Sequence, residues 1–187
     1  MQKDTLSQEE KNKDDFLEYE EKRVRPSPAA VLAAIAEAFP AYPLDPTGVF
    51  KEWGIGYLDV PKFTEQSKGR LWTELTPKFL EYFGDAANFL GSQGYAQYLP
   101  AYLSAAVAFP PEIDCLPYSL LSSLQPMPEN PYVEQRLWLR RARLTEKQQI
   151  AVAQALEYLV QAFSDSSIGE MAKSALDGFW RDRLPKK

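Results

Sequence analysis

Residues 89–103 constrain the fold more than any other part of the chain. The stretch is rich in aromatic residues and is interrupted by Gly91, Gly94 and Pro100, while the segments on both sides carry helical patterns. A proline inside a helix costs on the order of 3 kcal/mol but is tolerated in the first turn. We therefore predict that the stretch is the junction between two helical halves, with a new helix starting at about Leu99.

Helix start signals recur along the rest of the chain. A serine or threonine at a helix start accepts a hydrogen bond from a backbone N–H, and proline suits the first helical position. Ser-Pro at 27–28 and Thr-Pro at 76–77 both fit this pattern. Thr145 and Gln148 form a capping-box pattern before the most regular apolar stripe in the chain. These signals favour helices, and a last helix is expected over about 169–184.

The predicted fold class is mainly α. A length of 187 residues favours one domain, and fifteen prolines with 13% aromatic residues indicate short helices joined by proline-rich connections. We expect a compact single-domain bundle of about five to seven short helices with long Pro-rich loops. At most a minor edge strand is expected near 55–63, where Pro61 would restrict extended backbone to a sheet edge.

The first 26 residues differ from the rest in composition. They are nearly all polar, with mixed charge and few apolar side chains that could offset the entropy of ordering. We predict a charged tail or loosely docked helix over 1–26, followed by a single helical domain over 27–184. No apolar stretch approaches the roughly 18–20 residues that span a bilayer, and no signal peptide is visible. A cytoplasmic location is the expectation.

Charge and cysteine content narrow the classes of partner and cofactor. The net charge of −5 disfavours nucleic acid and anionic membranes, and favours either plain solubility or an acidic face that meets a basic protein partner. Cys115 is the single cysteine, so no internal disulfide or cysteine-based zinc cluster can form. Because Glu112 and Asp114 would oppose thiolate formation, we interpret Cys115 as a buried, inert thiol.

The absence of histidine is the most informative negative feature for catalysis. It removes the commonest general base, the usual metal ligand and histidine-activated nucleophiles. Glu81 and Asp85 are four residues apart, so both could share one helix face and hold a hard cation or act as acid and base. Solvated surface charge is the simpler interpretation of the pair. No cofactor motif is present, and we predict no catalytic, cofactor or metal residues.

Two groups of residues are candidates for an interaction surface. Tyr95, Tyr98 and Tyr102 would fill the core with hydrogen-bonded hydroxyls or form an exposed aromatic floor. Arg136, Arg140 and Arg143 would share one helix face, either paired with acidic residues elsewhere or, with neighbouring Arg141 and Trp138, contacting phosphates and stacking on bases. The candidate surface comprises Tyr95, Tyr98, Tyr102, Arg136, Trp138, Arg140 and Arg143.

Several of these signatures occur in an order that resembles a known family. They are the helix start at 72–77, Phe89-Leu90 with the Tyr98-Leu99-Pro100-Ala101-Tyr102 motif, Leu116-Pro117, and Leu144-Thr145. They resemble a family of uncharacterised bacterial proteins, over about residues 27–180. The chain departs from that pattern at 54–67, where a more acidic stretch would be expected. The resemblance implies a small cytosolic bacterial domain and no reaction, and supports a binding role by analogy.

The sequence favours a non-enzymatic protein–protein interaction module, such as an immunity-type or regulatory protein with an unknown, basic protein partner. The first alternative is a carboxylate-only enzyme or metal site around Glu81 and Asp85. The second alternative is a weak nucleic-acid binder that uses the arginines of 136–143.

Overall fold

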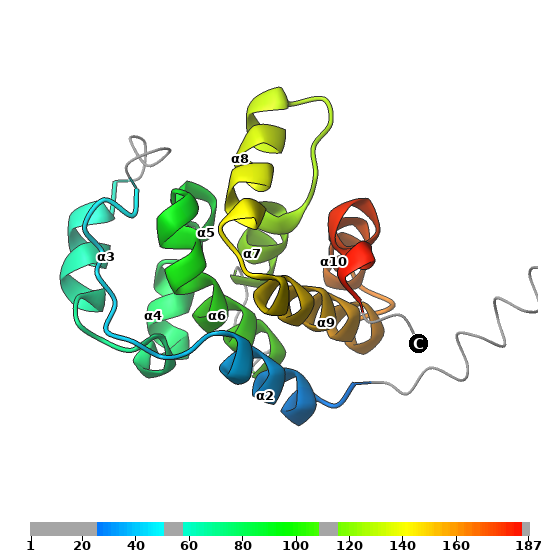
Figure 1. Cartoon of the computed structure of the whole chain (residues 1–187), viewed down its shortest axis with the longest axis horizontal. Coiled ribbons are helices and arrows are strands. Elements are labelled where there is room, and N and C mark those ends of the chain that lie inside the picture. Colours follow the sequence, from blue (N-terminus) through cyan, green and yellow to red (C-terminus); the bar gives the residue numbers. More distant parts are fainter. Residues whose placement is uncertain (1–25, 51–57, 109–115, 185–187) are drawn as a thin grey trace, which may run out of the picture.

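The computed structural model describes residues 26–50, 58–108 and 116–184. Within these ranges the chain forms nine α-helices and no strand (Figure 1). The α-helices are α2 (Pro28–Ala38), α3 (Val60–Ser67), α4 (Pro77–Tyr82), α5 (Ala86–Phe89), α6 (Ser92–Ala108), α7 (Leu116–Leu124), α8 (Pro131–Ala142), α9 (Glu146–Ala162) and α10 (Ser167–Ala175). The mainly α class is confirmed, and the expected five to seven helices is slightly low.

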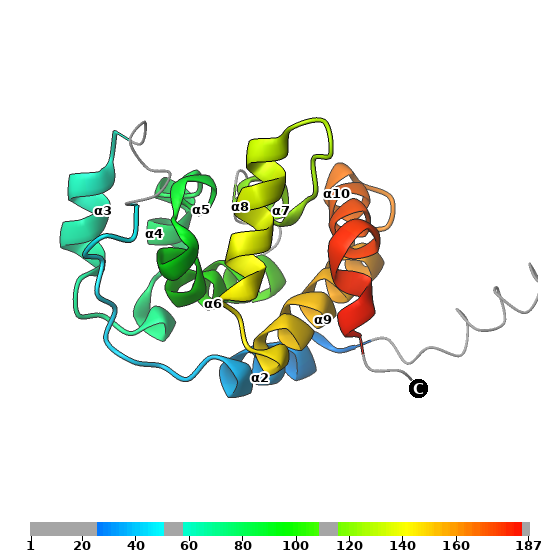
Figure 2. The same cartoon turned by 45° about the horizontal axis from the view of Figure 1, so that its top comes forward.

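Helix α6 lies at the centre of this arrangement, with α2, α4, α5, α7, α8 and α9 in contact with it (Figures 1 and 2). Three of its tyrosines are buried, and each hydroxyl reaches a different element. Tyr95 Oη is 2.9 Å from Ser123 Oγ on α7, and Tyr98 Oη is 2.9 Å from Ser67 Oγ on α3. Tyr102 donates to the Phe83 carbonyl oxygen at 2.8 Å, just after α4. The structure therefore supports the interpretation that these tyrosines fill the core with hydrogen-bonded hydroxyls, and not the alternative of an exposed aromatic floor.

The predicted helix break near Leu99 is wrong. α6 runs unbroken from Ser92 to Ala108 with Pro100 inside it. Proline removes one hydrogen bond of the helix, to the carbonyl four residues earlier. The buried tyrosine hydroxyl bonds on both sides of Pro100 fix the helix in place, and this tertiary packing outweighs the local preference. The junction lies earlier, where α5 ends at Phe89 and Gly91 precedes α6.

The minor edge strand expected near 55–63 is also contradicted where the structure describes that segment. Residues 58–59 form a turn and Val60 begins α3, while 55–57 lie outside the described residues. Pro61 lies in the first turn of α3. Proline is tolerated there, as it is at the edge of a sheet. Phe63, on the same helix, is fully buried against Phe50, Phe83 and Tyr98.

The local helix-start signals are confirmed. Ser27 and Thr76 accept hydrogen bonds from the backbone N–H groups of Ala30 and Phe79 at 3.2 Å in each case. The capping box of Thr145 and Gln148 opens α9, as predicted.

At the C-terminal end one continuous helix was expected over about 169–184. The chain instead forms α10, then a π-helical turn, η3 (Leu176–Trp180), and a 3-10 turn, η4 (Arg181–Arg183). A 3-10 turn, η2 (Trp72–Glu74), also precedes α4.

Gly94 allows the start of α6 to lie directly against Val49. A Cβ built on Gly94 would lie 2.5 Å from Val49 Cβ and 2.7 Å from Val49 O. The amide of Gly91 also donates to Val49 O at 2.7 Å, so the loop before residue 50 lies directly on the start of α6. Among the described helices, none is long and apolar enough to cross a membrane.

Candidate functional site

The arginines of α8 point mainly into the molecule. Arg140 is buried, with 1% of its surface exposed, and its guanidinium lies 4.2 Å from the ring centroid of Tyr95. Carbonyl oxygens at the end of α5 accept hydrogen bonds from it at 2.6 to 3.1 Å: those of Ala87, Asn88 and Leu90. Arg136 also donates to Asn88 O, at 2.9 Å. Because the last carbonyls of a helix lack partners within it, these cations cap α5.

The environment of this cap shifts two pKa values. Burial lowers the pKa of the half-buried Arg136 guanidinium, and nearby Tyr95 partly offsets that shift. Burial raises the pKa of the Tyr95 hydroxyl, against the opposing charge of Arg140 and the hydrogen bond with Ser123. At neutral pH Tyr95 is therefore a neutral ring against a buried cation, which is a structural arrangement.

Arg141 joins α8 to the C-terminal turns. It donates to both carboxylate oxygens of Asp182, at 2.8 and 3.0 Å, and to the carbonyl oxygen of Phe179. Its guanidinium lies 4.5 Å from the ring centroid of Phe179 and 5.5 Å from that of Trp180. Arg141 therefore holds the π-helical turn η3 against α8.

The four arginines consequently do not form one exposed basic face. Arg140 and Arg141 are buried and Arg136 is half-buried, so Arg143 is the exposed member of the group. The spacing argument placed Arg136, Arg140 and Arg143 on a shared face, but among the described residues the side chains of Arg136 and Arg140 donate to backbone carbonyls. Tyr95, Tyr98 and Tyr102 are at most 1% exposed and do not belong to a surface either.

Trp138 is the member of the predicted surface that is exposed and aromatic. It shows 57% of its surface, and its ring lies edge-on to Phe179 with centroids 4.6 Å apart. Trp72 and Trp180 are buried, and their indole N–H groups donate to Phe39 O and Leu124 O at 3.0 Å each. Within the described ranges, the indole N–H of Trp138 has no such acceptor. The indole N–H is therefore available to an acceptor that a partner supplies.

Two further apolar side chains share the outer side of α8. Tyr132 is 78% exposed and Leu139 is 43% exposed. Together with Trp138 they form what we call the α8 face (Tyr132, Trp138 and Leu139). Sequence reasoning missed Tyr132 and Leu139, although Leu137 to Arg140 are four consecutive residues that cannot all point inward on one helix. In Figure 1, α8 reaches the upper edge of the molecule.

A surface hollow of about 250 Å³ adjoins the α8 face. It is lined by Trp138, Arg141, Asp177, Gly178, Phe179, Arg181 and Asp182. Its acids are held by bases: Asp182 by Arg141, and Asp177 by Lys173 and Arg181. Burial alone would raise the pKa of Asp177, but the hydrogen bonds and charges of Lys173 and Arg181 bring it below the usual value. The hollow is thus an aromatic recess with a charge-balanced rim.

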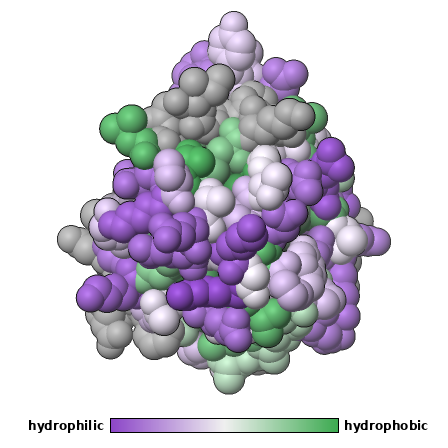
Figure 3. Space-filling model, turned by 90° about the vertical axis from the view of Figure 1, so that its left-hand side faces the viewer, coloured by the Kyte–Doolittle hydropathy of each residue, from purple (hydrophilic) through white to green (hydrophobic). Residues whose placement is uncertain are grey.

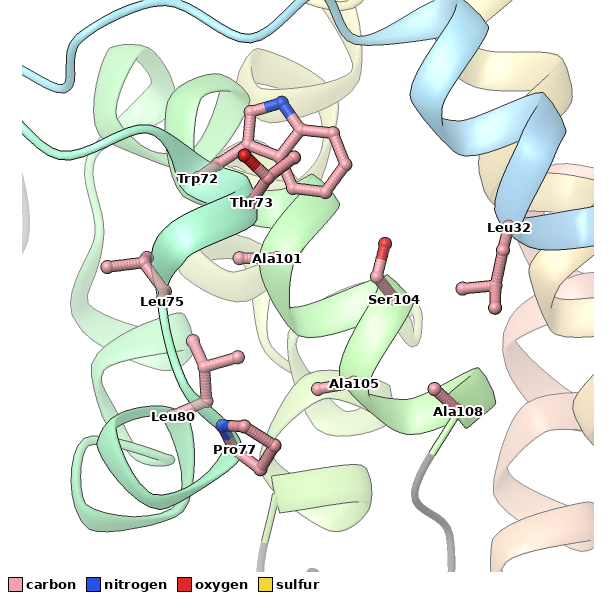
Figure 4. Close-up of a pocket in the computed structure, with 10 residues that line it drawn as sticks. All are labelled: Leu32, Trp72, Thr73, Leu75, Pro77, Leu80, Ala101, Ser104, Ala105 and Ala108. Carbon is pink, nitrogen blue, oxygen red and sulfur yellow. The ribbon is translucent and has the colours of Figure 1, made fainter.

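A smaller apolar hollow of about 150 Å³ lies among α2, η2, α4 and α6 (Figure 4). Four small residues of α6 form its floor: Ala101, Ser104, Ala105 and Ala108. Its wall comes from Leu32, Trp72, Thr73, Leu75, Pro77 and Leu80. No lining residue ionises near neutral pH, so the hollow offers shape for an apolar group and no acid or base that could activate the hydroxyls of Thr73 and Ser104.

Neither carboxylate of the enzyme alternative lines either of the two hollows described above. Glu81 is half-buried on α4, whereas Asp85 is exposed in the turn before α5 and accepts a hydrogen bond from Ser119 at 2.9 Å. The two are not on one continuous helix, because α4 ends at Tyr82. In the described part of the chain no group of three acidic, cysteine or histidine residues could hold a metal ion. Cys115 lies outside the described residues.

Comparison with known proteins identifies the family. The model of a family of unknown function, DUF6714, matches residues 51–184, and the chain belongs to this family. That range includes most of the segment on which the resemblance was based. Neither a curated protein nor a solved structure matched the chain in the corresponding searches.

Proposed function

We propose that this member of the family is a non-enzymatic interaction module that binds a protein partner through the α8 face. The observation that carries the proposal is Trp138: a half-exposed indole whose N–H has no acceptor among the described residues, beside a hollow of about 250 Å³. Exposed tryptophan and tyrosine are the residues that most often anchor protein interfaces. An immunity-type or regulatory role is one form that such binding takes.

The support beneath the face suits an interface anchor. Trp138 rests on Phe179, and the Arg141 guanidinium lies 5.9 Å from its ring centroid. Arg141 is in turn fixed by Asp182 and by the Phe179 carbonyl. An anchor held in one position before binding loses less conformational freedom on binding. The π-helical turn η3 completes the recess, and such turns are frequent at functional sites.

The partner that fits this surface presents an apolar side chain to the hollow and carries basic groups around it. The chain has a net charge of −5, which attracts a basic protein over long range. At short range, Asp182 is exposed on the rim and has acceptor capacity beyond its bonds to Arg141. A carbonyl or hydroxyl of the partner would accept the Trp138 N–H.

Binding rather than catalysis is supported by what the described surface offers. The α8 face has no pair of titratable groups that could share a proton with a substrate, since the acids of its hollow are paired with bases. The chain contains no histidine to act as base at neutral pH.

The test is site-specific photo-crosslinking in the cells that make the protein. In one variant a photoreactive residue replaces Leu139 on the α8 face. In the control variant it replaces Tyr82, which is also exposed, at 57%, but lies on α4. We expect one discrete adduct with a basic protein from position 139 and none from position 82. Equal labelling from both positions, or no adduct from position 139, would overturn the assignment to α8.

A further inference from the structure

A third hollow differs in chemistry from the two described above. It measures about 280 Å³ and is lined by Lys62, Gln66, Arg70, Thr76, Lys78, Phe79 and Tyr82. Its residues come from α3, from the segment before η2 and from the start and end of α4. The side of the molecule on which α3 lies is largely hydrophilic (Figure 3). Three of its lining residues are cations and none is a carboxylate, in a chain whose net charge is −5.

One cation of this basic hollow, Lys62, is held in position, and the described residues form no ion pair with Lys62, Arg70 or Lys78. Lys62 Nζ donates to Tyr82 Oη at 2.7 Å and lies 3.9 Å from the ring centroid. The backbone of Arg70 is fixed on both sides, since its carbonyl accepts from Leu44 N at 2.7 Å and its amide donates to Ser67 O. No described carboxylate lies within ion-pair distance of Arg70 or Lys78. Cations on the other side of the molecule are paired, for example Lys173 with Asp177.

The remaining lining residues define what accompanies the charge. Thr76 Oγ1 already accepts from Phe79 N at 3.2 Å, so its hydroxyl proton is available for an oxygen in the hollow. Gln66 adds an amide donor, and the rings of Phe79 and Tyr82 supply an apolar wall. Lysine, arginine and hydroxyl donors around one space match the oxygens of a phosphate group.

We propose that this basic hollow binds a small phosphate monoester. Lys62, Arg70 and Lys78 surround the phosphate dianion, Thr76 donates to it, and the organic part lies against Tyr82. The volume falls just below the range of pockets that hold drug-sized ligands, which fits a compact ester. The site is independent of the α8 face and requires nothing of the proposed partner.

The test is calorimetric titration of the full chain with phenyl phosphate at low salt, alongside inorganic phosphate and phenol. We expect phenyl phosphate to bind with a Kd of about 1 mM or tighter, which corresponds to about −4 kcal/mol. Inorganic phosphate should bind more weakly because it lacks the contact with Tyr82, and phenol should not bind measurably. Equal affinities for phenyl phosphate and inorganic phosphate would overturn the monoester assignment, and no binding of either would overturn the site.

Charge variants distinguish binding in the hollow from nonspecific electrostatic attraction to the protein surface. Arg70→Ala and Lys78→Ala each remove an exposed cation and should weaken phenyl phosphate binding about tenfold. Lys68→Ala is the matched control, because Lys68 is exposed near Arg70 but does not line the hollow. A loss from Lys68→Ala as large as that from Arg70→Ala would contradict the proposal. Trp138→Ala should leave phenyl phosphate binding unchanged, whatever becomes of the protein partner.

Discussion

Replacing Arg140 by alanine tests the claim that the arginines of α8 are structural. Arg140 supplies hydrogen bonds to Ala87 O, Asn88 O and Leu90 O. After the replacement Asn88 O keeps its bond from Arg136, so two carbonyls lose their arginine donor. Each unsatisfied buried group costs about 1–3 kcal/mol, and loss of the desolvated contact with Tyr95 adds about 1–2 kcal/mol.

The variant also removes a buried charge, which releases its desolvation cost and lowers the net effect. We expect Arg140→Ala to lower the free energy of unfolding by about 3 kcal/mol. This value lies at the lower end of the sum of the contributions above, because the variant no longer bears the cost of burying the Arg140 charge. The assay is urea unfolding followed by circular dichroism. Arg143→Ala, on the same helix but exposed, is the control and should change stability by less than about 0.5 kcal/mol. If Arg140→Ala were as stable as Arg143→Ala, the capping account of α5 would be refuted.

Three further predictions concern the core and its ionisable groups. Gly94→Ala should lower the free energy of unfolding in urea by about 1–2 kcal/mol, because the added Cβ would clash with Val49 and the cost of this overpacking exceeds the gain in helix propensity. Gln93→Ala, on the exposed side of the same helix, should not lower it. Burial raises the pKa of Tyr98 from 10.0 to about 12, against the opposing effect of its hydrogen bond with Ser67. The contribution of this group to stability is therefore complete below pH 10 and is lost as the pH rises to about 12, so tyrosinate absorbance and circular dichroism should change together in that window. Asp182→Asn should lower the free energy of unfolding by about 1 kcal/mol, because it removes the ion pair with Arg141, whose side chain is only 8% exposed. The loss should be smaller at high salt, because salt screens the exposed Asp182 carboxylate.

Local chemistry made part of the fold predictable. The side chains of Ser27, Thr76 and Thr145 cap helices within three residues of themselves, so their sequence neighbours were enough to place the helix starts. Pro100 was misjudged because the contacts that stabilise a continuous α6 involve Ser67, Phe83 and Ser123, which are 19 to 31 residues from their tyrosine partners.

The candidate surface failed in part for the same reason. Spacing correctly indicated that Arg136 and Arg140 share a side of α8, but the acceptors that turn this side inward are backbone carbonyls about fifty residues earlier. No side-chain pattern marks a free carbonyl. Trp138 was identified as part of the surface, while the recess beside it depends on the π-helical turn η3, which the expected continuous helix did not foresee.

The most direct test of the interaction account is the affinity of the crosslinked partner for purified variants. Trp138→Ala should weaken binding by at least about 2 kcal/mol, which is roughly thirtyfold in Kd, while loss of the ring contact with Phe179 lowers the free energy of unfolding by no more than about 1.5 kcal/mol. Tyr82→Ala, an exposed aromatic on α4, should leave the Kd within about twofold of the parent chain. Equal affinities for the parent chain and Trp138→Ala would contradict the central claim that the α8 face is the binding surface.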